Sequence, residues 1–223
     1  MKIVARIYTG FVEKFGIPRQ SGLAEAALGR IVFEPEYRVK DALRGIDGYS
    51  HLWLIWKFSE AEREEWSPTV RPPRLGGNKK MGVFATRSPY RPNPIGLSSV
   101  RLVGVEETEN EGTVLIVSGA DILSGTPIFD IKPYLAFTDS HPDAVGGFAD
   151  GVRDDALDVD FPEELLYLIP DSDKETVTDL LRGDPRPHYQ SDPERVYGMI
   201  YGKREIFFKV DAKRLTVVNV KKR

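Results

Sequence analysis

The sequence predicts a mainly β fold, in which a small antiparallel β-barrel is followed by a smaller α+β domain. Short runs with an apolar residue at every second position dominate the stretch up to residue 135, and this period is typical of half-buried strands. Glycine and proline separate the runs, and many short strands of this kind favour a closed or nearly closed barrel. The pattern changes after about Phe137, which indicates a second domain.

We assign residues 1–138 to the barrel. Its strands, rich in β-branched and aromatic residues, are expected at Lys2–Thr9, Arg30–Phe33, Ser50–Phe58, Gly82–Thr86, Ser98–Glu107 and Thr113–Ser118. Asn110–Gly112 predicts a hairpin turn between the last two strands. One short helix is expected around Val39–Arg44, ahead of a turn at Gly45–Gly48.

We assign residues 139–223 to the α+β domain, with 139–160 as a linker or long loop. His141–Asp155 is rich in Asp, Gly and Ala and has no periodicity. Helices are expected at Pro162–Ile169, where proline suits the first helical position, and at Lys174–Arg182, which Gly183 closes. Three antiparallel strands are expected at Arg195–Tyr201, Glu205–Val210 and Leu215–Val220.

The composition excludes several classes of protein. The 223 residues contain no cysteine, which rules out disulfides, thiolate nucleophiles, iron–sulfur clusters and Cys-ligated zinc. The three histidines are scattered, so no metal site is expected. Arg6 interrupts the apolar start and no apolar run is long enough for a bilayer, so we expect no membrane segment and a cytoplasmic location. Phosphate-loop, Rossmann and nucleophile-elbow motifs are absent from the sequence.

Charge is segregated along a chain whose net charge is −3. Ser67–Arg101 contains seven basic residues and no acidic one, whereas Asp139–Asp173 contains eleven acidic residues and one arginine. Lys203–Arg223 is basic again, with eight basic and two acidic residues. Such segregation lets an acidic protein present a positive face to a nucleic acid; a solvated surface is the alternative interpretation.

Met81–Val100 predicts a stiff loop with polar side chains. Pro89, Pro92 and Pro94 fix the backbone beside Arg87, Arg91 and Asn93. Such a loop suits binding of a carboxylate, a phosphate or a base edge, although it could serve only as a rigid connection. Two turns after strands add candidates, because Phe15–Gln20 offers a cation and an amide, and Asp121–Pro127 offers a carboxylate. Asp121 could accept hydrogen bonds from a ribose diol or merely cap its turn.

Together, five segments resemble the TrmO (TsaA-like) family: Phe15–Gln20, Arg71–Asn78, Met81–Ser98, Asp121–Tyr134 and Asp184–Tyr189. The stretches ATRSPYRPNPIGLS and GTPIFDIKPY are the most specific. Members of this family are S-adenosylmethionine-dependent tRNA methyltransferases that act on N6 of threonylcarbamoyl-adenosine beside the anticodon of threonine tRNA. The resemblance therefore implies a barrel that holds S-adenosylmethionine, a C-terminal domain, a homodimer and a tRNA partner bound through its anticodon loop.

The resemblance also implies the cofactor contacts, which fall on Pro18, Arg19, Gln20, Ser59, Glu60, Arg87, Leu97, Asp121, Ile122, Leu123 and Ser124. Ser124 stands where the family commonly has Asp, and Ser59-Glu60 replaces a His-Gln pair. We expect Asp121 to hold the ribose diol, and Arg19 or Arg87 to hold the carboxylate. Backbone carbonyls around Leu97 would face the electropositive methyl group.

The acceptor nitrogen is a poor nucleophile because its lone pair is delocalised, so a base or a stabilising cation would help. Asp130 is the candidate base, and Lys132 and Tyr134 are candidate stabilisers; a buried Asp–Lys pair that braces the barrel is the alternative. Candidate tRNA contacts are Arg71, Arg74, Tyr90, Arg91, Asn93, Arg186 and Tyr189. Tyr90 and Arg91 would stack on a splayed base, and Asp184–Tyr189 would contact the threonylcarbamoyl group or form an interdomain turn.

Two other functions stay open at this point. One keeps the cofactor and changes the acceptor to another RNA or a small molecule. The other is a non-catalytic barrel that binds S-adenosylmethionine or RNA.

Overall fold

The computed structural model describes residues 1–223 except 62–64, 73–74, 76–77, 153–155 and 187–191. Six strands form a closed antiparallel barrel in the order β1-β2-β7-β6-β3-β8. Their bounds are Ala5–Thr9 (β1), Leu28–Phe33 (β2), His51–Lys57 (β3), Ile95–Thr108 (β6), Gly112–Ser118 (β7) and Thr126–Pro133 (β8). Strand β1 pairs with both β2 and β8, which closes the barrel and confirms the expected fold class.

Alternation along the strands sorts side chains between the barrel interior and its outer wall. In β3, Leu52, Leu54 and Trp56 are buried, whereas the residues between them are partly exposed. The inward-facing residues join one apolar cluster with others such as Ile7 and Ile128. The period of two in the sequence therefore follows the pleat of the sheet.

One expected strand of the first domain is wrong, and one observed strand was not predicted. The expected strand Gly82–Thr86 is extended only in β5 (Met81–Gly82), which pairs with β4 (Thr69–Val70). Val83–Ala85 forms a 3-10 turn (η5), because the Thr86 N–H and hydroxyl both donate to the Val83 carbonyl. The short helix expected around Val39–Arg44 is present as the 3-10 helix η2 (Lys40–Leu43), which stands between two further 3-10 helices, η1 (Pro35–Tyr37) and η3 (Ile46–Gly48). Strand β8 had not been expected at all.

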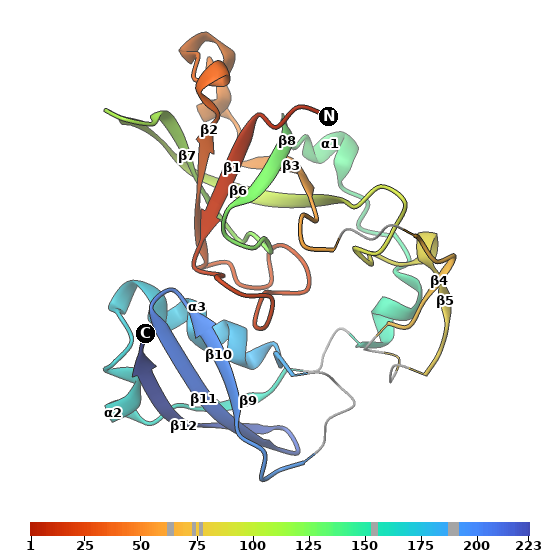
Figure 1. Ribbon diagram of the computed structural model, residues 1–223, viewed down its shortest axis with the longest axis vertical. Helices are drawn as coiled ribbons and strands as arrows, with labels where there is room; N and C mark the ends of the chain where they lie inside the picture. The colour runs from red at the N-terminus through yellow and green to blue at the C-terminus, as the bar shows by residue number, and fades with distance from the viewer. Residues whose placement is uncertain (62–64, 73–74, 76–77, 153–155, 187–191) are drawn as a thin grey trace.

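The C-terminal part is a four-stranded sheet in the order β10-β11-β12-β9, drawn in blue below the barrel in Figure 1. Before it, α1 (Ala136–Asp139) lies beside the barrel in Figure 1, and η6 (Gly147–Val152) lies in the connection between the two parts. The remaining elements are β9 (Asp158–Asp160), α2 (Glu163–Leu166), α3 (Asp171–Arg182), β10 (Tyr197–Tyr201), β11 (Arg204–Asp211) and β12 (Arg214–Lys222). Strand β9 pairs parallel with β12, although it lies in the stretch expected as a linker. Gly183 ends α3, but Asp184 takes the left-handed conformation with φ 48°.

The loop after β1 joins the barrel to the C-terminal sheet. Phe11 and Ala24 pack into the apolar core of the C-terminal sheet, and the Phe11 ring meets the Tyr201 ring edge-on with centroids 5.4 Å apart. The Gly202 N–H donates to the Gly10 carbonyl at 2.8 Å. This loop therefore packs on both parts and connects them mechanically. Over the described ranges, no helix is long and apolar enough to cross a membrane.

Candidate functional site

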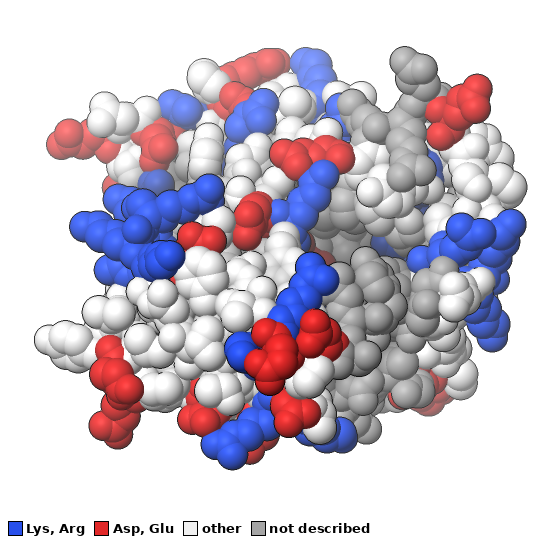
Figure 2. Space-filling model, turned by 60° about the horizontal axis from the view of Figure 1, so that its bottom comes forward, with Lys and Arg blue, Asp and Glu red and all other residues white. Residues whose placement is uncertain are grey.

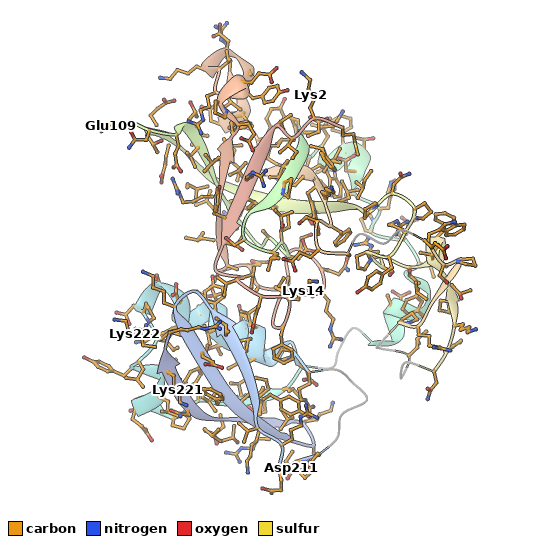
Figure 3. All side chains as sticks on the ribbon, viewed as in Figure 1. Lys2, Lys14, Glu109, Asp211, Lys221 and Lys222 are labelled. Carbon is orange, nitrogen blue, oxygen red and sulfur yellow. The ribbon has the colours of Figure 1, made fainter. Side chains whose placement is uncertain are left out.

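A cavity of about 1610 Å³ lies where three segments meet. One wall is the loop that follows β1 from Lys14 to Ala24, the second is the proline-rich segment that ends at Pro94, and the third is the end of α3 with the turn after it. We call it the interdomain cavity. Lys14, labelled in Figure 3, lies on the side of the barrel that faces the C-terminal sheet.

Basic side chains predominate in the described lining of the interdomain cavity. They are Lys14, Arg19, Arg71, Lys80, Arg87, Arg91 and Arg186, against the acidic Glu65, Asp179 and Asp184. On the face drawn in Figure 2, one group of Lys and Arg side chains lies at the left of the view and another at the right, with further basic side chains scattered among acidic and uncharged residues between them. A cavity lined in this way attracts phosphates and carboxylates.

Three of the expected cofactor residues meet beside the cavity. An Arg87 Nη1–H donates to Gln20 Oε1, and the positive charge of Arg87 acts on the carboxylate of Asp121. The Ser98 hydroxyl donates to Asp121 Oδ1 at 2.5 Å, and Trp56 Nε1–H donates to Ser98 Oγ at 3.0 Å. Burial raises the pKa of the Asp121 carboxyl, while Ser98, backbone donors and Arg87 oppose the rise.

Hydrogen bonds fix the turn that carries Asp121. The Thr9 hydroxyl donates to the Ile122 carbonyl at 2.9 Å, and the Ser124 N–H donates to the Phe11 carbonyl at 2.8 Å. The Ile122 side chain belongs to the barrel core, Leu123 is half-buried, and Ser124 Oγ accepts the Thr9 N–H. These residues hold the turn through their backbone and hydroxyl groups, so Ser124 supports the turn without a carboxylate.

The proline-rich loop is stabilised from within. Arg91 Nη1–H donates to the Thr86 carbonyl at 3.1 Å, and the Tyr90 N–H donates to Ser88 Oγ at 3.2 Å. The Tyr90 side chain is 41% exposed at the cavity. A stiff loop that presents an exposed aromatic ring suits the stacking of a splayed base.

The expected tRNA residues are only partly brought together. Arg71, Tyr90, Arg91 and Arg186 line the interdomain cavity. Asn93 is exposed but is not among the described lining residues. The structure does not describe Arg74 and Tyr189, so these two candidates lie outside the described residues.

Arg19 and Arg186 are engaged in contacts between the two parts of the chain. Arg186 forms a two-pronged ion pair with Asp184, and these side chains are only 11% and 8% exposed. Arg19 Nη2 donates to the backbone carbonyls of Asp184 and Arg186 at 3.1 and 3.2 Å. Both guanidinium groups therefore have protein partners at the cavity wall.

Other expected cofactor residues lie farther from the cavity. Ser59 and Glu60 follow β3, and Glu60 contacts the lining residue Lys14, whose Nζ lies 3.2 Å from Glu60 Oε2 and donates to the Glu60 carbonyl at 3.0 Å. Leu97 is 59% exposed on β6, in register with Ile55 of β3. Its side chain alternates with the inward-facing Gly96 and Ser98 and so points away from the barrel interior.

The three expected catalytic residues are absent from the described lining of the cavity. Asp130 and Lys132 lie on β8, with Asp130 Oδ2 and Lys132 Nζ 3.8 Å apart and their side chains 54% and 63% exposed. The Tyr134 ring packs against the Trp53 ring, with centroids 5.4 Å apart. The alternative of a buried bracing pair is therefore wrong, because both charges face solvent.

Ser98 was not predicted as a site residue, because a serine in an alternating strand is typical of ordinary barrel sequence. Trp56 was not predicted as a site residue either, since an inward-facing aromatic residue is typical of a core. A search for small polar residues at inward positions could have found Ser98, because a buried hydroxyl needs a partner.

Comparisons with known proteins agree on one family. A family model described as the tRNA-methyltransferase O N-terminal domain matches residues 6–140, and the TrmO C-terminal domain matches residues 155–223. A tRNA (adenine(37)-N6)-methyltransferase of Escherichia coli K12 is 41% identical over 194 residues, which are 84% of this chain and 82% of that protein. The protein of the same name from Eikenella corrodens is 47% identical over 165 residues, 73% of this chain and 92% of its own.

The fold agrees as well. A crystal structure of TrmO from P. aeruginosa superposes with a TM-score of 0.81 at 32% identity, over 100% of this chain and 97% of that one. Since one family model covers more than half of the chain and a second covers most of the remainder, the chain belongs to the TrmO family of tRNA methyltransferases.

Proposed function

We propose that this protein transfers a methyl group from S-adenosylmethionine to N6 of adenine 37 in a tRNA. The names of the relatives from E. coli and E. corrodens support the reaction. Within this chain, the supporting observation is the cluster of Gln20, Arg87 and Asp121 beside a cationic cavity between the two parts of the chain. The acceptor we propose is the threonylcarbamoyl-adenosine beside the anticodon of threonine tRNA, and the location we propose is the cytoplasm.

The donor set of the cluster fits S-adenosylmethionine. The Asp121 carboxylate can accept hydrogen bonds from ribose hydroxyls, and the Arg87 guanidinium can pair with a carboxylate. Bound there, S-adenosylmethionine supplies an electrophilic methyl group on a sulfonium. The chain's own contribution is to orient the reactants, which accelerates an in-line displacement strongly.

The basic lining and the stiff loop would present the tRNA. Arg71 and Lys80 suit phosphate contacts, which position an RNA without reading its sequence. Tyr90 offers the exposed ring on which the target base would stack. Arg91 would support that ring by holding the loop through the Thr86 carbonyl.

The base role of Asp130, with Lys132 and Tyr134 as stabilisers, stays a prediction, as does the homodimer. The two are compatible if the outer wall of β8 faces the cavity of a second copy, since the trio is absent from the described lining of its own cavity. Mixing an Asp130→Asn chain with an Arg87→Ala chain tests this arrangement. Activity in the mixture, but in neither variant alone, is the expected result, and a mixture as inactive as its parts excludes shared sites.

The test of the proposed function is methyl transfer from labelled S-adenosylmethionine to threonine tRNA, with and without the threonylcarbamoyl group. We expect label in the modified tRNA only, and loss of transfer in Arg87→Ala. Arg214→Ala, which breaks an exposed ion pair with Asp160 far along the C-terminal sheet, is the control and should keep full transfer. Cofactor binding without label in either tRNA would shift the acceptor to another RNA or a small molecule, or indicate a non-catalytic binding barrel.

A further inference from the structure

We propose that Arg19, Asp184 and Arg186 form a strut between the two parts of the chain, and that this strut holds Gln20 and Arg87 in the geometry that binds the cofactor. In this assignment Asp184 and Arg186 are positioning residues. The inference rests on the proposed use of S-adenosylmethionine. The strut would make the affinity of the barrel for S-adenosylmethionine depend on the turn after α3, which belongs to the C-terminal part.

The ion pair at the base of the strut is fixed at several points. Asp184 Oδ1 accepts hydrogen bonds from the Arg186 N–H at 3.2 Å and from Arg186 Nε at 2.9 Å, and Oδ2 accepts one from Nη2 at 3.0 Å. Both side chains are nearly buried, and the Asp184 N–H donates back to the Leu181 carbonyl at the end of α3. The turn therefore has one shape, which the pair enforces.

That shape aims two carbonyl groups at the barrel loop. The carbonyls of Asp184 and Arg186 both accept hydrogen bonds from Arg19 Nη2. A planar guanidinium can satisfy several acceptors at once, which an ammonium on a flexible stem does less well. Arg19 is thereby held by the backbone of the C-terminal part while its own backbone belongs to the loop after β1.

Hydrogen bonds continue from Arg19 to the cofactor cluster. Gln20 Nε2 donates to the Arg19 carbonyl, and Gln20 Oε1 accepts the hydrogen bond from Arg87. Both ends of the Gln20 amide are thus engaged, which fixes its orientation. A continuous set of hydrogen bonds therefore leads from the turn after α3 to Arg87, whose positive charge opposes the rise that burial causes in the pKa of the Asp121 carboxyl.

The strut should affect binding more than chemistry. When it is weakened, Gln20 and Arg87 sample more orientations, and a site that must be ordered on binding has a lower affinity. Once the cofactor is bound, the same residues are again in place. We therefore expect a higher KM and dissociation constant for S-adenosylmethionine with a nearly unchanged kcat, whereas a loss of folded protein would lower kcat alone.

Asp184→Asn is the informative variant. Asparagine tolerates the positive φ of this position and matches aspartate in shape, so the backbone can persist while the charge of the pair is lost. Asp171→Asn is the matched control, because it removes the charge of an exposed ion pair with Lys174 at the other end of α3. Calorimetry should show about tenfold weaker binding of S-adenosylmethionine for Asp184→Asn, as expected when charge-assisted contacts are lost, and wild-type affinity for Asp171→Asn.

A second variant separates the strut from a direct contact of Arg19 with the cofactor. Arg19→Lys and the double variant Arg19→Lys/Asp184→Asn complete a double-mutant cycle. If Arg19 acts through the strut, the double variant should bind no more weakly than the weaker single variant. Additive losses, or an unchanged dissociation constant in folded Asp184→Asn, would overturn the proposal. If Asp184→Asn does not fold, Arg186→Lys, which weakens the same ion pair without changing Arg19, takes its place in the cycle, and a wild-type dissociation constant in that folded variant overturns the proposal.

The binding measurement needs no tRNA, so the two proposals can fail separately. Wild-type protein that binds S-adenosylmethionine but methylates no tRNA would contradict only the proposed acceptor. Wild-type protein that does not bind S-adenosylmethionine would overturn both.

Discussion

Replacing Ser98 with alanine should damage both the barrel and the cofactor cluster, because its hydroxyl joins two groups that are hard to leave unpaired. Ser98 Oγ accepts a hydrogen bond from Trp56 Nε1 and donates one to Asp121 Oδ1. Ser98 and Trp56 are buried, and Asp121 is half-buried. The Ser98→Ala variant therefore leaves a buried N–H donor without this acceptor and a carboxylate without its nearest side-chain donor.

The expected loss of unfolding free energy follows from these two contacts. A hydrogen bond to a charged group contributes about 1.5–3 kcal/mol, and a buried donor left without a partner costs about 1–3 kcal/mol. The two effects overlap because one hydroxyl makes both contacts, so we expect a loss of about 3 kcal/mol at neutral pH. That is a large fraction of the stability of an ordinary domain.

The loss should also depend on pH. Burial raises the pKa of Asp121 and the Ser98 hydroxyl lowers it, so removal of the hydroxyl raises this pKa further. An acid whose pKa is raised in the folded state favours folding below its unfolded pKa, and this contribution disappears as the pH rises through the folded pKa. The deficit of Ser98→Ala should therefore grow as the pH increases from the ordinary Asp value of 3.8 through the raised pKa.

Urea unfolding followed by tryptophan fluorescence at several pH values measures this deficit. Ser99→Ala is the matched control, because Ser99 is the next residue on β6 and faces the outer wall. Its unfolding free energy should stay within about 0.5 kcal/mol of the wild type. A Ser98→Ala deficit below about 1 kcal/mol, or one that is constant with pH, would refute the reasoning.

Three further predictions concern the same region. Gly96→Ala should lower the unfolding free energy in urea by about 1–3 kcal/mol, because a Cβ there would lie 2.2 Å from the Trp56 ring; wild-type stability would show that the ring can move aside. The unfolding free energy of Asp121→Asn at pH 8 should be at least that of the wild type, because the substitution removes a half-buried charge. Calorimetry should show that this variant binds S-adenosylmethionine more weakly, and equal affinity would exclude a ribose contact. Arg71→Ala and Lys80→Ala should each reduce the slope of log tRNA affinity against log salt by about 0.7–0.9, and an unchanged slope would remove that residue from the phosphate contacts.

The strands of the barrel could be predicted from the sequence where one face of a strand is buried and the other is exposed to solvent. His51–Lys57 is such a case, because its alternation of letters is the alternation of its burial. Thr126–Pro133 could not be predicted in this way, because it holds two prolines and a register shift where it pairs with β3. Its strand conformation depends on partners on both sides, β1 and β3, which are distant in sequence.

The sequence predicts which residues belong to the candidate site, but it does not predict which of them contact one another. The meeting of Gln20 and Arg87 depends on how two loops pack, and no local pattern records that. Asp130 is predicted as the base because it is the one carboxylate beside the basic loop segments in the sequence, but the pleat of β8 leaves it on the exposed outer wall. Arg19 or Arg87 was expected to pair with the carboxylate of the cofactor, but the partners of Arg19 in the structure are backbone carbonyls of a turn that is distant in sequence. No local sequence pattern records that contact.

The closure of the barrel through β1 and β8 has a consequence for biosynthesis. Ala5 and its partner Ile128 are about 120 residues apart, and contacts between such distant positions form late because a long loop must first close. During synthesis on the ribosome, β1 can pair only with β2 until β8, the last strand of the barrel, has emerged. Translation rate and chaperone access during that interval should therefore govern the yield of folded protein more than the stability of the finished barrel does.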